Sequence, residues 1–389
     1  MTGSTGRGRR RPALIAAGIA GVALLTIGML VWWTYGRLEG NISTVDTSAN
    51  NALGDVRPAK ENEALNILAI GSDSREGDNS FVGGDSPGLA DTTMVVHVSA
   101  DNSWAAAVSI PRDSMVQMPD CVQPDGTIVP GAVRMFNAAY PIGGPTCVQR
   151  TVESLTGLRI DHFVVIDFAG FQDMVEAVGG VTVYIPDRIS DPESKIYFDA
   201  GCQTLTGKEA LNYVRVRHGV GNGSDTDRIK RQQAFLSSLI QKVTSAGVLF
   251  NPIDLYQFLD AATQAITTDS ELGSIRALAS VAVRVRATGL DQIEFATVPW
   301  EAYPPNPNRV QWKQPEADEM WDRLRLDLPL TVDKPSPKPS PSTSSGSASG
   351  EPSPSPSASA SGSGSASPTP TPTSSFDTTT ADTPICPAS

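Results

Sequence analysis

The first long feature of the hydropathy pattern is an uncharged segment near the N-terminus. Residues 13–35 contain no charged side chain, and at about 1.5 Å of rise per residue they can cross a hydrocarbon core of roughly 30 Å. Four arginines lie within residues 1–12, and aromatic side chains mark the far end of the segment: Trp32, Trp33 and Tyr35. The positive-inside rule therefore predicts a cytoplasmic N-terminal tail, one transmembrane helix and an extracellular remainder.

A cleaved signal peptide is the alternative interpretation of this segment. The apolar region of a signal peptide is typically about 7 to 15 residues long, and residues 13–35 exceed that length. No clean small-x-small cleavage motif follows them. We therefore predict an uncleaved membrane anchor, followed by a juxtamembrane linker over residues 36–64.

Beyond this linker, apolar runs of strand length alternate with segments of helical period. Strands are expected at 66–70, 92–99, 104–110, 162–168, 181–185 and 293–298. Helices are expected at 145–157, 169–178, 206–215, 226–246, 253–266, 273–286 and 316–326. The turn at residues 100–103 makes the second and third strands a hairpin. This alternation predicts an α/β domain over residues 65–327.

The C-terminal stretch has a different composition. Residues 328–389 form a low-complexity tail, and residues 335–375 consist almost wholly of Ser, Pro, Gly, Ala and Thr. Such a segment cannot bury enough apolar surface to offset the entropy lost on ordering. It is therefore expected to be a flexible tail, or alternatively an O-glycosylated or wall-threading spacer. Cys386 is the one sign that its end is tethered.

Charge and cysteine content limit the classes of function. The formal net charge is −12, and removing the four N-terminal arginines leaves −12 − 4 = −16 for residues 36–389. An acidic surface repels phosphate, so bulk binding of nucleic acid is not expected. All four cysteines fall on the exported side, where disulfides persist. Cys121 and Cys147 are the expected pair, while Cys202 could pair with Cys386 or stay free.

Three loops that carry acidic and basic side chains meet at one edge of the predicted sheet. Asp91 precedes the second strand and Arg112 follows the third, so the hairpin brings both to the same edge. Asp73 follows the first strand and joins them if that strand is antiparallel to the second. Two carboxylates and an arginine there could hold a hard cation and an anionic ligand. The alternative is that these are ordinary turn residues and that Arg112 merely pairs with Asp113.

A basic cluster reverses the sign of charge locally. Five basic side chains occur within residues 214–233, namely Arg215, Arg217, Arg228, Lys230 and Arg231. Arg228, Arg231 and Gln232 share one helix face. The helix N-terminus at Asp225 and the arginine forks favour a phosphate-bearing ligand. The arginine stripe continues into apolar positions from Phe235 onward, which suits a ligand with a phosphate head and a lipid tail.

Several ordered segments together resemble the LytR-CpsA-Psr family of cell-envelope proteins. They read NILAIGSDSR, LADTTMVV, AVSIPRDSMV, FNAAY, IDHFVVIDFAGFQDMVEAVGGVTV and ALNYVRVRHG…SDTDRIKRQQ. The resemblance covers residues 65–243 and, more loosely, 293–326. It implies a three-layer α/β/α sandwich with a mixed central sheet. It also implies a membrane-anchored phosphotransferase that moves a glycopolymer from a polyprenyl-pyrophosphate carrier to peptidoglycan.

The resemblance also implies roles for single residues. Asp73 and Asp91 match acids that bind Mg²⁺, and the expected pyrophosphate-binding side chains are Arg75, Arg112, Arg215, Arg217, Arg228, Arg231 and Gln232. The expected catalytic residues are Asp73, Arg112, Arg217 and Asp225. One departure is Asp227, where family members often have Gly. A separate C-terminal domain of some members is replaced by the low-complexity tail.

Two other functions fit the same residues. A pyrophosphatase would act on polyprenyl pyrophosphates with water as the acceptor. A binding or regulatory module would only sequester lipid-linked intermediates, but then Asp73 and Asp91 would have no purpose at the site.

Overall fold

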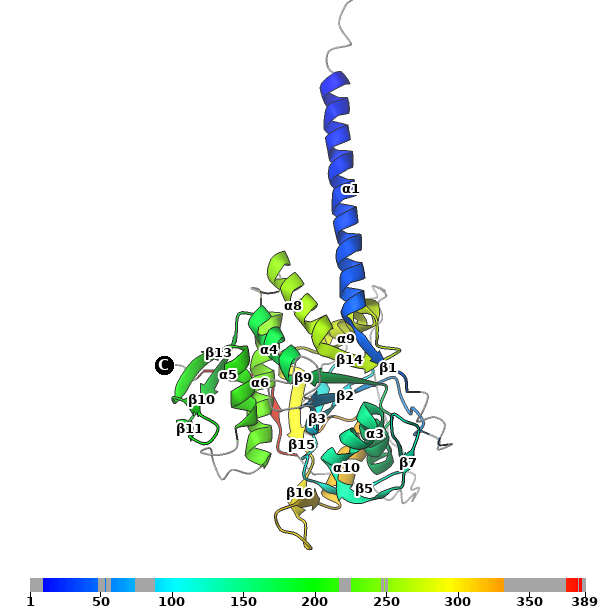
Figure 1. Ribbon diagram of the computed structural model, residues 1–389, viewed down its shortest axis with the longest axis vertical. Helices are drawn as coiled ribbons and strands as arrows, with labels where there is room; N and C mark the ends of the chain where they lie inside the picture. Colours follow the sequence, from blue (N-terminus) through cyan, green and yellow to red (C-terminus); the bar gives the residue numbers. More distant parts are fainter. Residues whose placement is uncertain are drawn as a thin grey trace, which may run out of the picture.

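The computed structural model describes residues 10–47, 53, 57–73, 88–216, 225–245, 248, 251–331, 376–383 and 385–386. A long helix, α1 (Arg10–Asn41), stands out from the body of the protein (Figure 1). Within the described ranges, Ile19–Asn41 is the one segment of a helix long and apolar enough to cross a membrane. The predicted apolar helix is therefore present, and it extends beyond Tyr35.

The predicted linker over residues 36–64 is partly built into the body. α1 continues to Asn41, and β1 (Ser43–Val45) then pairs in parallel with β14 (Ile266–Asp269). Such a short polar strand gives no period-two signal, and its partner lies more than two hundred residues away. The sequence pattern therefore could not reveal it.

The centre of the body is a mixed sheet with the strand order β1-β14-β9-β2-β3-β4-β15-β18. Its other strands are β2 (Leu65–Ser72), β3 (Ala90–Val98), β4 (Ala105–Ser109), β9 (His162–Asp167), β15 (Ile293–Thr297) and β18 (Thr379–Thr380). β3 is antiparallel to both β2 and β4, which confirms the predicted hairpin. β9 is parallel to β2, and β15 is parallel to β4.

Helices cover both faces of this sheet, giving three layers (Figure 1). One face carries α3 (Ala139–Thr156) and α10 (Glu316–Arg325). The other side carries α4 (Phe168–Ala177), α5 (Gly207–Arg215), α6 (Asp225–Thr244), α8 (Pro252–Ala265) and α9 (Ile275–Thr288). Along β2, Leu68 and Ile70 join the core under α3 and α10, whereas Leu65 and Ile67 join the core under α6 and α9. A strand apolar on both faces requires such double cover, and the predicted α/β/α sandwich is confirmed.

Several short elements lie outside the central sheet. They are η2 (Phe136–Ala138), η3 (Leu290–Gln292) and the paired strands β5 (Met115–Met118) with β8 (Ala132–Met135), β6 (Cys121–Val122) with β7 (Ile128–Val129), β10 (Val181–Ile185) with β13 (Gly201–Leu205), β11 (Ile189–Asp191) with β12 (Ile196–Phe198), and β16 (Trp300–Ala302) with β17 (Val310–Trp312). The disulfide Cys121–Cys147 ties β6 to α3, as expected from the sequence.

The end of the chain returns to the body, which corrects the prediction that the folded domain ends near Asp327. β18 pairs antiparallel with β15 and extends the sheet by one strand. Cys386 is bonded to Cys202 on β13, the pairing that the sequence left open. Ala381 is buried, and its carbonyl accepts hydrogen bonds from Ser237 and Gln241 of α6. Residues 332–375 lie outside the described residues.

Candidate active site

The three loops nominated by the sequence meet at one edge of the sheet. Because β2 and β4 are both antiparallel to β3, the end of β2, the start of β3 and the end of β4 lie together. They enclose a pocket of about 390 Å³. Its lining consists of Asp73, Leu89, Asp91, Arg112, Asp113, Asn137, Arg215 and Arg228.

A β-bulge sets the position of Asp91. Gly71 pairs with Thr92 and Ser72 pairs with Ala90, so Asp91 is the extra residue between them. A bulge leaves its extra residue out of the ladder and re-aims the side chain. The Asp91 carboxylate accepts a hydrogen bond from Arg112, and its backbone carbonyl accepts one from Arg228 at 3.0 Å.

The Arg112 loop is held by backbone hydrogen bonds. Ser114 N–H donates to the Pro111 carbonyl at 3.1 Å, and Asn137 N–H donates to the Arg112 carbonyl at 3.1 Å. The second bond brings Asn137 of η2 into the pocket lining. Asn137 was not among the site residues predicted from the sequence. The only sequence signal for Asn137 was the FNAAY segment that contributes to the family resemblance.

Asp225, the first residue of α6, lies behind the two buried arginines. Its carboxylate is 2.5 Å from Arg228 Nη2 and 3.4 Å from Arg112 Nε. Burial raises the pKa of the Asp225 carboxyl, and the charges of Arg228 and Arg112 oppose that shift. Burial likewise lowers the pKa of Arg228, an effect that Asp225 opposes. Asp225 therefore holds both guanidiniums in place at the back of the pocket.

Buried polar atoms without a hydrogen-bond partner gather around this pocket. Among the described residues they include the following: Arg228 Nε, Asn137 Oδ1, Ser114 Oγ and Thr93 Oγ1, while Arg112 Nε and the Asp225 carboxylate make an ion pair but no well-aligned hydrogen bond. Most buried polar groups in proteins are hydrogen-bonded, so a cluster of unpaired ones indicates a site that a ligand completes. Donors and acceptors occur together here, which suits a ligand that carries both oxygen atoms and a cation.

The other predicted ligand-binding residues differ in where they lie relative to the pocket. Arg215, the last residue of α5, lines the pocket and stacks on Phe168, with its Cζ 4.3 Å from the ring centroid. Arg231 and Gln232 lie outside the lining and donate hydrogen bonds to the carbonyls of Val216 and Val214. They fasten α6 to the end of α5. Two further predicted residues, Arg75 and Arg217, lie outside the described residues.

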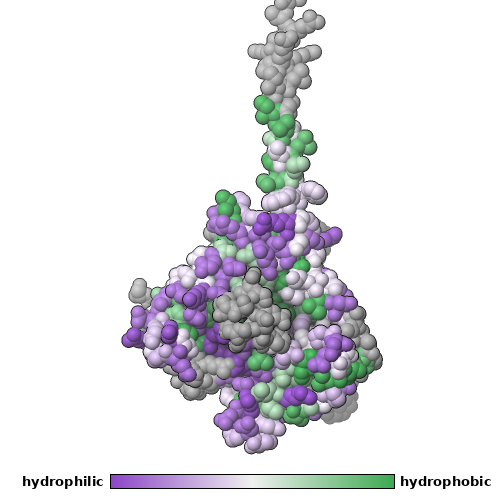
Figure 2. Space-filling view, viewed as in Figure 1, coloured by the Kyte–Doolittle hydropathy of each residue, from purple (hydrophilic) through white to green (hydrophobic). Residues whose placement is uncertain are grey.

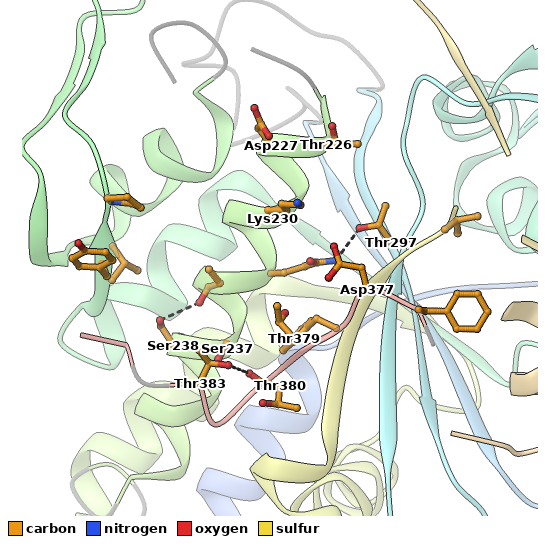
Figure 3. A pocket seen from close by; sticks show the side chains of 18 of the residues that line it. Thr226, Asp227, Lys230, Ser237, Ser238, Thr297, Asp377, Thr379, Thr380 and Thr383 are labelled. Carbon is orange, nitrogen blue, oxygen red and sulfur yellow. Dashed lines mark hydrogen bonds between the residues drawn. The ribbon is translucent and has the colours of Figure 1, made fainter. Parts of the chain in front are cut away.

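A second cavity of about 730 Å³ lies on another side of α6 (Figure 3). α6 contributes Asp227, Lys230 and Ser237 to its wall, and the C-terminal segment contributes Asp377 and Thr380. Asp227 thus lines this cavity rather than the arginine pocket. The extra negative charge noted in the sequence is directed to the other side of the helix.

Two of the three histidines, His97 and His162, have structural surroundings, and His218 lies outside the described residues. His97 is fully buried and bonds Asn66 at 2.7 Å and Asp327 at 3.0 Å. His162 lies 3.1 Å from Asp269, close enough to Glu271 for the three to hold a metal ion. The Asp269 carboxylate also accepts backbone hydrogen bonds, including one from the Phe163 N–H at 3.1 Å. This arrangement joins β14 to β9.

Comparison with known proteins gives consistent matches over most of the chain. The model of the LytR_cpsA_psr family matches residues 32–326. The probable cell wall biosynthesis protein LcpB of Corynebacterium glutamicum is 32% identical over 336 residues, which cover 82% of this chain and 74% of that protein. The polyisoprenyl-teichoic acid–peptidoglycan teichoic acid transferase TagU of Enterococcus faecalis is 28% identical over 277 residues, which cover 70% of this chain and 83% of that protein.

A solved structure shares the fold. The crystal structure of TagV of Bacillus subtilis matches with a TM-score of 0.53 and 26% sequence identity. The match covers 69% of this chain and 98% of that structure.

Proposed function

Since the chain belongs to the LytR-CpsA-Psr family, we propose that it transfers a glycopolymer from a polyprenyl-pyrophosphate carrier to peptidoglycan. The name of its relative TagU describes the corresponding transfer of teichoic acid. The observation that carries the proposal is the pocket at the sheet edge, which gathers three arginines and three aspartates and where Arg228 Nε and Asn137 Oδ1 lack hydrogen-bond partners.

The proposed reaction is a phosphoryl transfer. A peptidoglycan hydroxyl attacks the phosphorus that bears the sugar, and a new O–P bond forms as the pyrophosphate bridge breaks. Polyprenyl phosphate leaves, and the glycan remains joined to peptidoglycan by a phosphodiester. Negative charge develops on the leaving phosphate, so fixed positive groups supply most of the catalysis. Arg112, Arg215 and Arg228 are the pocket arginines that would bind these oxygens.

A divalent cation fits the charge balance of the pocket. The lining holds three arginines and three aspartates, so it carries little net positive charge for a pyrophosphate ligand. The hydrogen bonds described for Asp73 and Asp91 each engage a single carboxylate oxygen. These two carboxylates would hold Mg²⁺, which prefers oxygen ligands and usually accepts one or two carboxylates beside phosphate oxygens. The bound ion would neutralise phosphate charge.

Asp225 and Asp73 are the proposed candidates for accepting the proton of the attacking hydroxyl. Asp73 lines the pocket, whereas Asp225 lies behind the arginines. The position of Asp73 favours it as the group that meets an acceptor entering from solvent. The position of Asp225 favours a role in holding Arg112 and Arg228. Arg75 and Arg217 keep their predicted roles in binding pyrophosphate, whereas Arg231 and Gln232 would support the site by fastening α6 to the end of α5.

The membrane would present the donor to this site. α1 is the proposed single-pass anchor, with its N-terminus in the cytoplasm and the sheet domain outside. This orientation rests on the four arginines that precede the span.

The function is tested with a synthetic polyprenyl-pyrophosphate oligosaccharide and peptidoglycan fragments. We expect glycan on the fragments in the presence of Mg²⁺ and a loss of product in excess chelator. Release of free glycan phosphate with no dependence on the fragments would identify a pyrophosphatase instead. Tight binding of the donor without turnover would identify a binding module.

A further inference from the structure

Helix α8 lies beside the exposed helix α1 and is fixed to it by hydrogen bonds. Arg37 Nε and Nη2 bond the two Asp260 carboxylate oxygens at 3.1 and 3.2 Å. Asn41 Nδ2 bonds Asp260 and Thr263, both at 3.1 Å. Residue numbers rise in the same direction on both helices, so the N-terminal end of α8 points along α1 toward the apolar span (Figure 1).

The same contacts mark the level at which the apolar span ends. The Arg37 guanidinium lies 6.0 Å from the centroid of the Trp33 ring. Tyr256 precedes Asp260 by four residues on α8, which is about one helical turn. Tryptophan and tyrosine favour the boundary between water and lipid, and arginine near a helix end directs its charge to that boundary. Trp33 and Tyr256 thus each lie one turn before the paired residues Arg37 and Asp260 on their own helices.

The start of α8 reaches beyond this level. Ile253 precedes Asp260 by seven residues, which corresponds to about 10 Å along the helix axis. Even if α8 leaned by about 45° from α1, Ile253 would lie about 7 Å closer to the membrane than Asp260. Counting the same distance back along α1 from Arg37 gives the level of Trp32 and Trp33.

The side chain at this level is apolar and uncovered. Ile253 is 67% exposed, and Pro252 before it is exposed as well. Figure 2 shows hydrophobic surface at the top of the body beside α1, where α8 begins. An isolated surface isoleucine is ordinary, but this one lies at the height of the aromatic end of a membrane span.

We propose that the first turn of α8, carrying Pro252 and Ile253, inserts into the interfacial layer of the phospholipid bilayer next to α1. This inference rests on the proposed insertion of α1 in the membrane. Two adjacent points of insertion restrict rotation of the domain about the α1 axis, whereas a single helix would leave it free. The catalytic domain is thereby held in one orientation toward the membrane that carries its lipid-linked donor.

Site-directed spin labels test this contact in the full chain reconstituted in phospholipid nanodiscs. No cysteine among the described residues is free, so a label reacts selectively with one engineered thiol. The three variants are Ile253→Cys, Leu25→Cys in the middle of α1 and Val133→Cys on β8. Leu25 is 75% exposed and Val133 is 54% exposed, so all three labels are sterically tolerated. β8 pairs with β5 at the end of the body remote from α1 (Figure 1).

The readout is the collision rate of each label with oxygen, which concentrates in lipid, and with a water-soluble nickel complex. We expect the oxygen-to-nickel ratio at Ile253 to exceed that at Val133 severalfold and to approach that at Leu25. An Ile253 ratio equal to that of Val133, with Leu25 still in lipid, would overturn the α8 contact alone. Nickel access at Leu25 would overturn the membrane anchor and the inference together.

Discussion

Asp91 is the bulged residue of β3, and both of its polar groups contact arginines of the pocket. We expect Asp91→Asn to reduce glycan transfer by roughly 10², the size typical of losing one transition-state contact. The substitution keeps the side-chain shape, so thermal unfolding should change little. Initial transfer rates and a melting curve on the same sample test both expectations.

Arg188→Ala is the control for this substitution. The Arg188 side chain is 70% exposed, and its partner Asp199 is 88% exposed. Exposed ion pairs contribute little to stability, so transfer should stay near the wild-type rate. Equal losses of transfer rate in Asp91→Asn and Arg188→Ala would contradict the assignment of the pocket as the active site.

The buried carboxyl of Asp225 gives a pH-dependent prediction. Burial raises its pKa, Arg228 and Arg112 oppose the shift, and the negative charges of Asp113 and Asp91 add to it. Activity that needs ionised Asp225 therefore falls as the pH drops through this raised pKa, at a higher pH than for an ordinary aspartate. In Asp225→Asn the acidic limb of the pH–rate profile should shift to lower pH, whatever activity remains. An unchanged limb would assign it to another group.

The site was predictable from the sequence in part. Asp73, Asp91 and Arg112 could be placed together because hairpin topology follows from turn residues and apolar runs. The contacts of Arg231 and Gln232 could not be predicted in this way. A shared helix face does not show which hydrogen-bond acceptors the neighbouring helix presents. Here the carbonyls at the end of α5 accept their hydrogen bonds.

At the scale of elements, the strands and helices with strong periodicity were predictable to within a few residues. α5 begins with the capping box at Thr206 and Glu209 that its sequence indicates, and β2, β3 and β4 follow their apolar runs. β1 and β18 were not predictable, because they have only three and two residues and exist by pairing with a distant strand.

The C-terminal segment provides a prediction about stability. The disulfide Cys202–Cys386 joins residues 184 positions apart, and a disulfide closing a long loop typically contributes about 2–4 kcal/mol. Cys386→Ser should therefore lower the melting temperature, and Cys202→Ser should lower it by a similar amount. The double variant should be no worse than either single one, since both remove the same bond.

Deletion of residues 343–362 is the matched control. This stretch is confined to the Ser/Pro/Gly-rich composition that supplies no apolar period, so its removal should leave the melting temperature unchanged. If Cys386→Ser and this deletion behaved alike, the contact of the chain end with β15 would not contribute to stability.

The whole molecule combines the apolar helix α1 with an acidic body, and this arrangement predicts a defined topology. Protease added to intact cells stripped of their wall should degrade the body and leave a short membrane fragment, because the proposed orientation keeps the N-terminal arginines in the cytoplasm. Tags at the two ends of the chain allow the membrane fragment and the body to be detected separately with antibodies. Full protection of the body in intact cells, with digestion after lysis, would reverse the orientation.

The central claim is that this pocket joins glycan to peptidoglycan as it releases the lipid carrier. The most direct measurement is the stoichiometry of the two products, with polyprenyl phosphate and phosphodiester-linked glycan quantified by mass spectrometry in one reaction. We predict one glycan joined for each polyprenyl phosphate released, with both products falling together in Asp91→Asn. Polyprenyl phosphate accompanied only by free glycan phosphate, or no release from a donor that binds, would contradict the account.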